Sequence, residues 1–470
     1  MESHKRTYIR ELPKHISEVV LLKGWVHVRR DQGKMIFLDI RDSSGTIQSV
    51  ILPNSYAMEV GKNVREEYVV EAVGIVRGRP EQNKKIGVIN GDIELELEHL
   101  TILNTSETPP FPIHEDTRTV NESVRLEYRY LDLRNGRMRK NITNRFRVQN
   151  FIRNYLANLD FLEIETPLLS APTPEGARSY VVPSRLYNGA YYSLPQSPQQ
   201  YKQLLMVGGF EKYFQFARCM RDEDTRGDRQ PEFTQLDMEM AFVSREDVMQ
   251  LNEELLIKIV RTMYPEKKIQ QVPFPRMSYA EALERYGSDR PDIRENKDNQ
   301  NLLSFLWIVD FPMFEKTGDD NIDGTGEWTF THNPFSKPKD EHMSIFMKKQ
   351  SVENILTTQY DITLNGFEIG GGSIRNHQPE TLRTTFEIMG YGPGKVEKNF
   401  GHMLKALAFG APPHGGIAWG FDRLMMILEN EPSIREVIPF AKTGDGKDLM
   451  IHAPADIPQK LKTELGIKYV

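Results

Sequence analysis

The hydrophobic pattern of this 470-residue chain changes once, at a proline-rich stretch, and that change limits the folds open to it. Before the stretch, short alternating or apolar runs are separated by turn signals such as Asp42-Ser43-Ser44-Gly45. After it, longer segments repeat their apolar residues every three or four positions. Alternation is typical of half-buried strands, and the longer spacing is typical of amphipathic helices. The chain is therefore predicted to hold two domains of different architecture.

The N-terminal runs predict five strands, at residues 19–28, 35–40, 46–52, 68–76 and 93–103. Residues 55–67, between the third and fourth runs, have helical spacing. Five strands with one helix in that position are typical of an OB barrel. We therefore assign residues 1–104 to a five-stranded OB-fold β-barrel and residues 105–124, which contain three prolines, to a linker.

Residues 125–470 mix strands and helices without strict alternation, so the predicted fold class is α+β. Strands are expected at 161–164, 190–194, 213–221, 235–242, 305–310, 366–371 and 415–420. Helices are expected at 141–159, 199–208, 246–263, 279–286, 339–349, 379–389, 395–409 and 421–428.

Charge, cysteine count and hydropathy exclude some classes of protein. The 60 basic and 66 acidic residues give a net charge of −6, which is not the whole-chain signature of a nucleic-acid binder. Two runs are nevertheless basic, 5–34 and 125–153, and each is either a solvated face or a patch for nucleic acid. The single cysteine, Cys219, excludes an internal disulfide. Because no signal peptide or long apolar run is found, we expect a cytoplasmic protein without a membrane partner.

A first polar cluster lies at residues 216–239 and contains Arg221 and Glu223. Its second half places Gln235, Asp237 and Glu239 on one face of a predicted strand, because strand side chains alternate. If that face is buried, each of the three groups needs a partner. The alternative is the solvated face of a hairpin.

A second cluster joins Asp361 and Glu368 to three glycines and Arg375. Two carboxylates suit Mg²⁺, which leaves most of its coordination shell to phosphates and water. The glycines 370–372 either let a ligand approach the backbone or form a tight turn.

A third cluster, residues 414–424, ends a Gly-rich strand with Arg423 at the start of a helix. An arginine fixed there can grip a phosphate with two hydrogen bonds. An ion pair with Asp422 is the structural alternative.

In order and spacing, the clusters resemble the three motifs of class II aminoacyl-tRNA synthetases. Motif 1 matches a helix and strand ending at Pro167, motif 2 matches Arg221 to Phe233, and motif 3 ends at Arg423. Residues 173–178, 196–203 and 370–375 resemble the bacterial-type aspartyl-tRNA synthetases. The resemblance implies an antiparallel catalytic sheet flanked by helices in residues 125–470, a homodimer, and L-aspartate, ATP and tRNA(Asp) as substrates.

The resemblance also implies a role for each matching residue. Arg221, Glu223 and Arg423 would be catalytic, and Mg²⁺ would bind Asp361 and Glu368. Aspartate would contact Glu175, Ser197, Gln199, Lys202, Asp237, His332 and Arg375, of which Lys202 and Arg375 would hold its side-chain carboxylate. ATP would contact Arg221, Asp222, Glu223, Gln230, Phe233, Gln235, Glu368, Gly420, Asp422 and Arg423.

The barrel would read the tRNA anticodon through Arg30, Gln32, Phe37, Gln48 and Glu94. Stacking of a base on an exposed aromatic ring is worth about 1–3 kcal/mol. Periodicity alone, however, favours the barrel core for Phe37.

Two departures from the family accompany these expectations. The domain that bacterial-type members insert between motifs 2 and 3 is absent near residues 295–302, and Asn333 stands where a second histidine often follows His332.

Three alternatives stay open at this point. A non-discriminating enzyme would also charge tRNA(Asn), a choice often made near Gln32. An asparaginyl-tRNA synthetase is disfavoured, because Lys202 and Arg375 suit a carboxylate. An inactive paralogue would have no reason to keep the charged residues of all three motifs.

Overall fold

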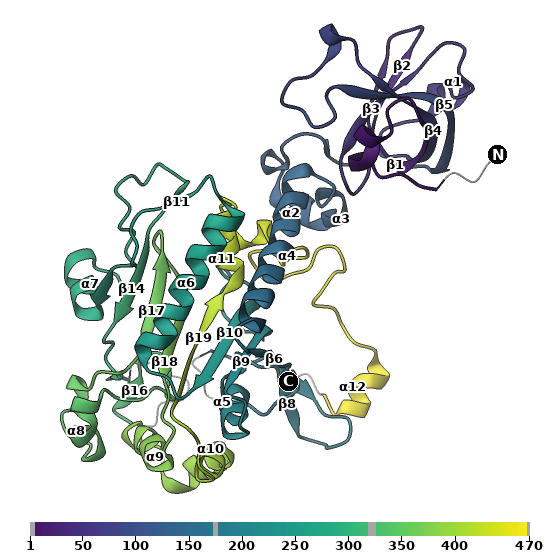
Figure 1. Cartoon of the computed structure of the whole chain (residues 1–470). Helices are drawn as coiled ribbons and strands as arrows, with labels where there is room; N and C mark the ends of the chain where they lie inside the picture. Colours follow the sequence, from purple (N-terminus) through teal and green to yellow (C-terminus); the bar gives the residue numbers. More distant parts are fainter. Residues whose placement is uncertain (1–4, 173–176, 318–325, 468–470) are drawn as a thin grey trace. The chain divides into compact units, whose positions relative to one another are not determined.

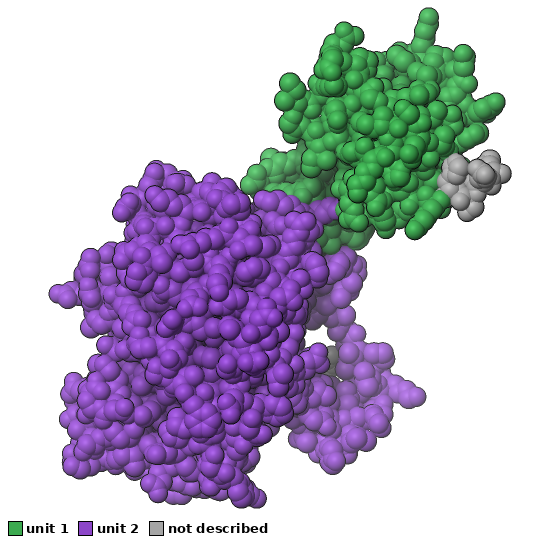
Figure 2. All heavy atoms as spheres, in the orientation of Figure 1, with its two compact units in different colours: residues 1–137 green, residues 138–470 purple. Residues whose placement is uncertain are grey.

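The computed structural model describes residues 5–172, 177–317 and 326–467. The chain divides into two compact units, residues 1–137 and 138–470, which Figure 2 shows in different colours. In the described ranges, no helix is both long and apolar enough to cross a bilayer.

The first unit contains the predicted closed barrel, with strand order β1-β2-β3-β5-β4. Its strands are β1 (Val19–Asp31), β2 (Ile36–Arg41), β3 (Thr46–Ile51), β4 (Val69–Gly78) and β5 (Ile93–Asn104). Helix α1 (Met58–Asn63) lies between β3 and β4, as expected. It is shorter than its pattern predicts because the chain turns extended at Val64.

Alternation of side chains explains the barrel core. Along β4, every second residue is buried, and Val70, Ala72 and Val76 point inward. The same alternation in β2 buries Leu38 and Ile40. The barrel therefore closes around one apolar cluster, and the intervening side chains form its outer face.

A buried carboxylate, Glu67, is held by three basic side chains of the same unit. Arg41 and Arg134 each donate to Glu67 Oε2 at 2.8 Å, and His27 Nδ1 lies 4.0 Å from Oε1. Although burial opposes the effect, hydrogen bonds from His27, Arg41 and Arg134 lower the pKa of Glu67 to about 2. Ionised Glu67 therefore stabilises this unit.

The catalytic unit expected from the sequence is built on an eight-stranded sheet, whose strands lie side by side behind α6 in Figure 1. The strand order is β12-β14-β17-β18-β19-β10-β9-β6. The six middle strands pair antiparallel, whereas β12 and β6 pair parallel to their neighbours at the two edges. The bounds are β6 (Leu162–Glu163), β9 (Lys212–Met220), β10 (Glu232–Ala241), β12 (Arg276–Ser278), β14 (Phe305–Val309), β17 (Tyr360–Leu364), β18 (Phe367–Ile374) and β19 (His414–Gly420).

The helices of this unit match the predicted ones closely, and several have clear end signals. Ser244 and Asp247 form a capping box at the start of α6, and Gly287 ends α7 at a φ of 65°. The long helices flank the sheet in Figure 1. Their bounds are α4 (Gly136–Ala157), α5 (Gln199–Val207), α6 (Arg245–Met263), α7 (Tyr279–Tyr286), α8 (Met343–Met347), α9 (Pro379–Ile388), α10 (Pro393–Leu407) and α11 (Phe421–Leu428).

Several short elements were not predicted. The pairs β7 (Val181–Pro183) with β8 (Tyr191–Ser193), β11 (Lys268–Ile269) with β13 (Leu302–Leu303), and β15 (Phe314–Lys316) with β16 (Trp328–Phe330) form two-stranded sheets, of which only β8 was expected. Helices α2 (Glu122–Glu127), α3 (Arg129–Asp132) and α12 (Gln459–Leu465) are also new. All are shorter than the stretch over which a period can be recognised, about 11–18 residues for a helix and about 4–8 for a strand.

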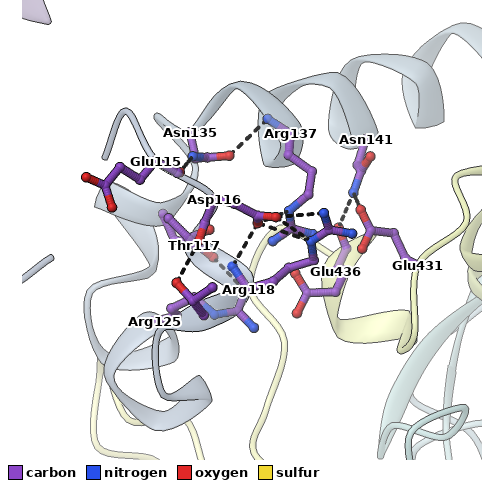
Figure 3. Close-up of polar contacts among 12 residues, drawn as sticks. Glu115, Asp116, Thr117, Arg118, Arg125, Asn135, Arg137, Asn141, Glu431 and Glu436 are labelled. Carbon is purple, nitrogen blue, oxygen red and sulfur yellow. Dashed lines mark hydrogen bonds and ion pairs between the residues drawn. The ribbon is translucent and has the colours of Figure 1, made fainter. Parts of the chain in front are cut away.

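The basic run 125–153 is mostly engaged in ion pairs. Arg129 donates to Asp132 at 2.7 Å, and Arg153 donates to Glu163 at 3.0 and 2.9 Å. In Figure 3, Arg118 and Arg137 point toward Asp116. These contacts lie within one unit or the other, and they favour a structural role for this run over a nucleic-acid patch.

Replacing Glu67 with Gln tests the buried carboxylate. Because the native pKa of about 2 lies below the ordinary 4.5, the ionised group stabilises the barrel fully above about pH 4.5, and this contribution is lost as the pH falls toward 2. We expect Glu67→Gln to lower barrel stability at pH 7 by about 2–3 kcal/mol and to flatten its acid dependence. Hydrogen-exchange protection factors for β1–β5 measure both effects.

The exposed Glu59, for which no ion pair is found among the described residues, supplies the matched control as Glu59→Gln. Equal protection in the two variants would contradict a stabilising role for Glu67.

Candidate active site

The register of the sheet puts two acids on one face with small residues between them. Asp361 on β17 pairs with Gly371, Gly371 pairs with Ala418, and Ala418 pairs with Asp237 on β10. Because the two middle residues are small, this row forms a low floor between the two carboxylates. The triple glycine thus lies inside a strand, and its interpretation as a tight turn is wrong.

A β-bulge decides which way Glu368 points. Ile362 pairs with Gly370 and Thr363 pairs with Glu368, so Ile369 is an extra residue on β18. Beyond the bulge, Glu368 shares a face with Gly371 and Arg375, which simple alternation would forbid. Glu368 and Arg375 lie an odd number of positions apart, so their spacing in the sequence could not show that they share a face.

The floor opens into a cavity of about 370 Å³. Most of the predicted site residues line it: Ser197, Gln199, Lys202, Arg221, Glu223, Gln230, Phe233, Gln235, Asp237, His332, Asp361, Glu368, Arg375, Gly420, Asp422 and Arg423. Asp222 is described but is not a lining residue, and Glu175 lies outside the described residues. One cavity therefore joins residues from all three sequence clusters.

Four buried charges lie at one end of the cavity, and three of them, Lys202, Asp237 and Arg375, line it. Lys202 Nζ lies 2.7 Å from Asp237 Oδ1 and 3.3 Å from Glu239 Oε2. Arg375 makes two hydrogen bonds to Glu239, at 3.0 and 3.2 Å. None of the four residues is more than 2% exposed. The polar face of β10 is therefore buried and paired, and the solvated-hairpin alternative is wrong.

The two carboxylates of this cluster differ in their surroundings. Burial raises the pKa of Asp237, whose Oδ2 has no hydrogen-bond partner among the described residues. Although burial also acts on Glu239, the charges of Arg375 and Lys202 lower its pKa. Asp237 thus offers one acceptor to a cationic group in the cavity, whereas Glu239 is committed to the protein.

Asp361 and Glu368 fit a divalent cation. A side chain at Gly371 would meet Asp361 Oδ1 at 2.7 Å and Glu368 Oε1 at 3.8 Å, so both oxygens converge above that glycine. Burial and the neighbouring Glu368 raise the pKa of Asp361 well above its usual range. One or two carboxylates are the usual protein ligands of Mg²⁺, which takes its other ligands from phosphates and water.

The opposite end of the cavity presents arginines. The Arg221 guanidinium lies 5.1 Å from the centre of the Phe233 ring, and within residues 5–172, 177–317 and 326–467 its Nε has no hydrogen-bond partner. Arg423 donates to the backbone oxygen of Glu368 and, at 3.1 Å, to Asp228. Two fixed cations beside an aromatic face suit a nucleotide with its phosphates.

Other predicted residues are held by the protein itself. Asp422 accepts from Arg145 and, at 2.8 Å, from the Thr234 backbone, so the suggested ion pair with Arg423 is wrong. Gln230 accepts from the Lys442 backbone at 2.8 Å.

Three other predicted residues that line the cavity also contact the protein. Gln235 accepts from the Cys219 thiol at 3.2 Å, and Ser197 accepts from the Gln199 backbone at 3.4 Å. His332 packs edge-on against Phe311, and burial lowers its pKa.

Sequence reasoning assigned no role to three contributors. Glu239 was seen only as part of a polar face, yet it joins the two cations. Arg229 donates to Glu223 at 3.0 Å, and Asp228 anchors Arg423. The signal that could have found Glu239 is its spacing of two residues from Asp237 on one strand.

In the barrel unit, strand register gathers the predicted contact residues on the outer face. Arg30 pairs with Phe37 across β1 and β2, and Asp39 pairs with Gln48 across β2 and β3. Gln48 donates to Glu94 at 3.3 Å. Gln32 lies in the turn between β1 and β2, where the sequence predicts it.

Phe37 is half-buried and belongs to no buried apolar cluster, so the core position favoured by periodicity is wrong. Its neighbours Ile36 and Leu38 point inward and leave Phe37 on the outer face. An aromatic ring between polar side chains on such a face suits stacking on a nucleic-acid base.

Each of the two units matches the model of a known protein family. Residues 121–444 match the model for class II tRNA synthetases (D, K and N), and residues 20–103 match the model for OB-fold nucleic-acid-binding domains. The first match covers more than half of the chain.

Curated relatives are similar along nearly the whole chain. The aspartate–tRNA ligase of Staphylococcus carnosus is 35% identical over 579 residues, covering 96% of this chain and 97% of the relative. The aspartate–tRNA(Asp/Asn) ligase of Dehalococcoides mccartyi is 37% identical over 590 residues, with 97% of each covered.

Among solved structures, the asparaginyl-tRNA synthetase of Pyrococcus horikoshii with asparaginyl-adenylate has a TM-score of 0.74 at 23% identity, covering 93% of this chain and 98% of that one. At this identity the likeness shows a shared fold.

Glu239→Gln tests the buried charge cluster. The substitution leaves Lys202 and Arg375 with one carboxylate between them, and breaking a buried pair costs about 3–5 kcal/mol. We expect a clear fall in the melting temperature of the full chain. Glu281→Gln is the control, because the side chains of Glu281 and its partner Arg285 are both exposed and such surface pairs contribute about 0–1 kcal/mol. Equal melting temperatures for the two variants would contradict this.

Proposed function

This chain belongs to the class II tRNA synthetases of the D, K and N group and is an aminoacyl-tRNA ligase, and we propose that it activates L-aspartate with ATP and transfers it to tRNA(Asp). The observation that carries the choice of aspartate is the buried pair Lys202 and Arg375 at one end of the cavity. The curated relatives named as aspartate–tRNA ligases support the same choice.

The charges of the pocket complement both ends of free aspartate. Lys202 and Arg375 would receive the side-chain carboxylate. Asp237 Oδ2, which accepts no hydrogen bond from the described part of the chain, and Gln199 would receive the α-ammonium group, together with Glu175. Ser197 and His332 would line the pocket. A neutral amide gains less from two cations, so asparagine would be rejected by the loss of charge complementarity.

The nucleotide would bind at the opposite end. Arg221 would hold the α-phosphate, and Phe233 with Arg423 would sandwich adenine. Glu223, Gln230, Gln235, Gly420 and Asp422 would complete the contacts, with Asp222 at the margin. A divalent cation held by Asp361 and Glu368, which we propose is Mg²⁺, would supply charge neutralisation to the phosphates.

The chemistry asks the protein mainly for positioning. A carboxylate oxygen of aspartate attacks the α-phosphorus of ATP, and pyrophosphate leaves. A terminal ribose hydroxyl of tRNA then attacks the carbonyl carbon of the adenylate, and AMP leaves. Arg221 and Arg423 would stabilise the negative charge that develops on the phosphate oxygens. This explains why no nucleophilic side chain is needed.

Anticodon readout would belong to the outer face of the barrel. Phe37 would stack on a base, and Arg30, Gln48 and Glu94 would contact neighbouring bases or phosphates. Charging of both tRNA(Asp) and tRNA(Asn) is the second candidate, supported by the Asp/Asn name of the Dehalococcoides relative, and Gln32 is the residue to examine.

The remaining proposals concern organisation. We propose an anticodon-binding domain at 1–104, a linker at 105–124 and a catalytic domain at 125–470. The match to the Staphylococcus relative runs over 579 residues, against 470 in this chain, which supports the loss of an inserted segment near 295–302.

Exposed Leu162, Leu168 and Leu169 next to motif 1 support a homodimer. Because charging of tRNA serves protein synthesis, we propose that the protein works in the cytoplasm.

ATP–pyrophosphate exchange tests the first step. We expect exchange with aspartate and little with asparagine, because only aspartate satisfies both cations. Absence of exchange with either amino acid would refute the enzymatic proposal and favour an inactive paralogue. Lys202→Met should abolish exchange with aspartate while ATP binding persists, whereas unchanged exchange would show that the pocket is assigned wrongly.

Phe37→Ala tests the barrel face. Loss of one stacked base should lower kcat/KM for charging of tRNA(Asp) by about 5–150-fold, equivalent to about 1–3 kcal/mol, without changing ATP–pyrophosphate exchange. Tyr56→Ala is the control, since this exposed ring stacks on His99 outside the β1–β2–β3 face.

Charging of tRNA(Asp) and tRNA(Asn) transcripts by the wild-type protein, assayed side by side, decides between the two candidate specificities.

For the Phe37 prediction, equal charging of tRNA(Asp) by Phe37→Ala and by wild type would show that Phe37 does not contact the tRNA.

A further inference from the structure

A chain of hydrogen bonds runs from a backbone carbonyl at the start of β19 into the amino-acid pocket. His414 Nδ1 lies 2.8 Å from the carbonyl oxygen of Pro412, and His414 Nε2 lies 3.1 Å from Gln203 Nε2. Gln203 Oε1 accepts from Gln199 Nε2 at 3.0 Å. Of these residues, Gln199 lines the cavity.

The carbonyl oxygen fixes the direction of every bond in this chain. Because a carbonyl can only accept, His414 Nδ1 must carry a proton, and in the neutral ring Nε2 is then an acceptor. Gln203 must therefore turn its NH₂ group toward His414 and its oxygen toward Gln199. Gln199 must in turn donate, which leaves its Oε1 as the acceptor for a ligand.

Burial keeps the histidine in the neutral form. His414 and Gln203 are each 0% exposed, and burial lowers the pKa of His414. The Glu239 carboxylate opposes this lowering, whereas Arg375 and His377 add to it. At neutral pH, His414 Nε2 thus remains an acceptor.

Helix geometry brings the two glutamines together. Gln199 and Gln203 are separated by one helical turn on α5, so their side chains are neighbours. Neither amide has a preferred orientation of its own, because the two ends of an amide group have nearly the same shape. The fixed end of the chain, at Pro412, supplies the preference.

We propose that His414 and Gln203 are positioning residues that orient the Gln199 amide with its oxygen toward the α-ammonium group of the amino-acid substrate. The inference rests on the proposed binding of an amino acid in this cavity. A reversed Gln199 amide would present NH₂ to a cation, which costs a hydrogen bond and adds repulsion. The α-ammonium group is common to all amino acids, so the proposal holds for whichever one the enzyme activates.

Two substitutions at Gln203 separate orientation from packing. Gln203→Met fills a similar volume without a donor or an acceptor, so Gln199 loses its fixed partner. We expect the KM for aspartate in ATP–pyrophosphate exchange to rise about tenfold, the size of one hydrogen bond to a charged group, with the KM for ATP within about twofold of wild type.

Gln203→Glu keeps an acceptor toward Gln199. Its carboxylate would also stabilise a second proton on His414, so that His414 Nε2 would donate to the new side chain. We expect its KM for aspartate to stay within about threefold of wild type. A residue that served packing alone would give the opposite order, because a buried carboxylate is more disruptive than methionine.

Gln200→Leu on the same helix is the matched control. Gln200 is also buried and also contacts a histidine, His402, but it does not line the cavity. An unchanged KM for aspartate in Gln203→Met would overturn the proposal. A Glu variant at least as impaired as the Met variant, or a parallel rise in the KM for ATP, would also overturn it. Failure of wild type to activate aspartate, with another amino acid activated instead, would refute the substrate assignment alone, and the same variants would then be assayed with that amino acid.

Discussion

The catalytic unit depends on four charges that none of its elements could bury alone. Lys202 comes from α5, Asp237 and Glu239 come from β10, and Arg375 follows β18. An isolated ionised group in such surroundings costs many kcal/mol, so each element is stable in its position only when the other two are present. Packing of α5 over the sheet and the order β18-β19-β10 are thereby tied to one electrostatic arrangement. The binding pocket and the folded core share the same contacts.

Much of the architecture followed from periodicity. The barrel strands alternate over most of their length, because one face packs in the core and the other faces solvent, and the long helices carry clear apolar stripes with capping residues such as Ser244. These are local signals, and local signals can be read from one sequence. The OB topology and the α+β class were predicted for this reason.

Features that depend on distant partners were harder to predict. Strand β17 (Tyr360–Leu364) alternates apolar and polar residues as a half-buried strand would, yet all five residues are buried, so the sequence pattern does not show that Asp361 lies inside the fold. The role of Glu239 depends on its ion pair with Arg375, which lies far along the chain and which the sequence does not reveal. Periodicity favoured the core for Phe37. Because Phe37 stands between the apolar residues Ile36 and Leu38, the pattern does not show which of the three side chains point into the barrel. The residues that matched a family motif were found, whereas their supporting partners were not.

The extra residue at Ile369 has a consequence for how this segment can change over time. Glu368 and Arg375 reach the same cavity because one unpaired residue between them shifts the alternation of β18. Gain or loss of a single codon between these two positions would exchange the cavity face for the opposite one and turn either the carboxylate or the guanidinium away. Substitutions can accumulate in this stretch, but its length cannot vary by one. The length of the segment is therefore inherited as strictly as the identity of its charged residues.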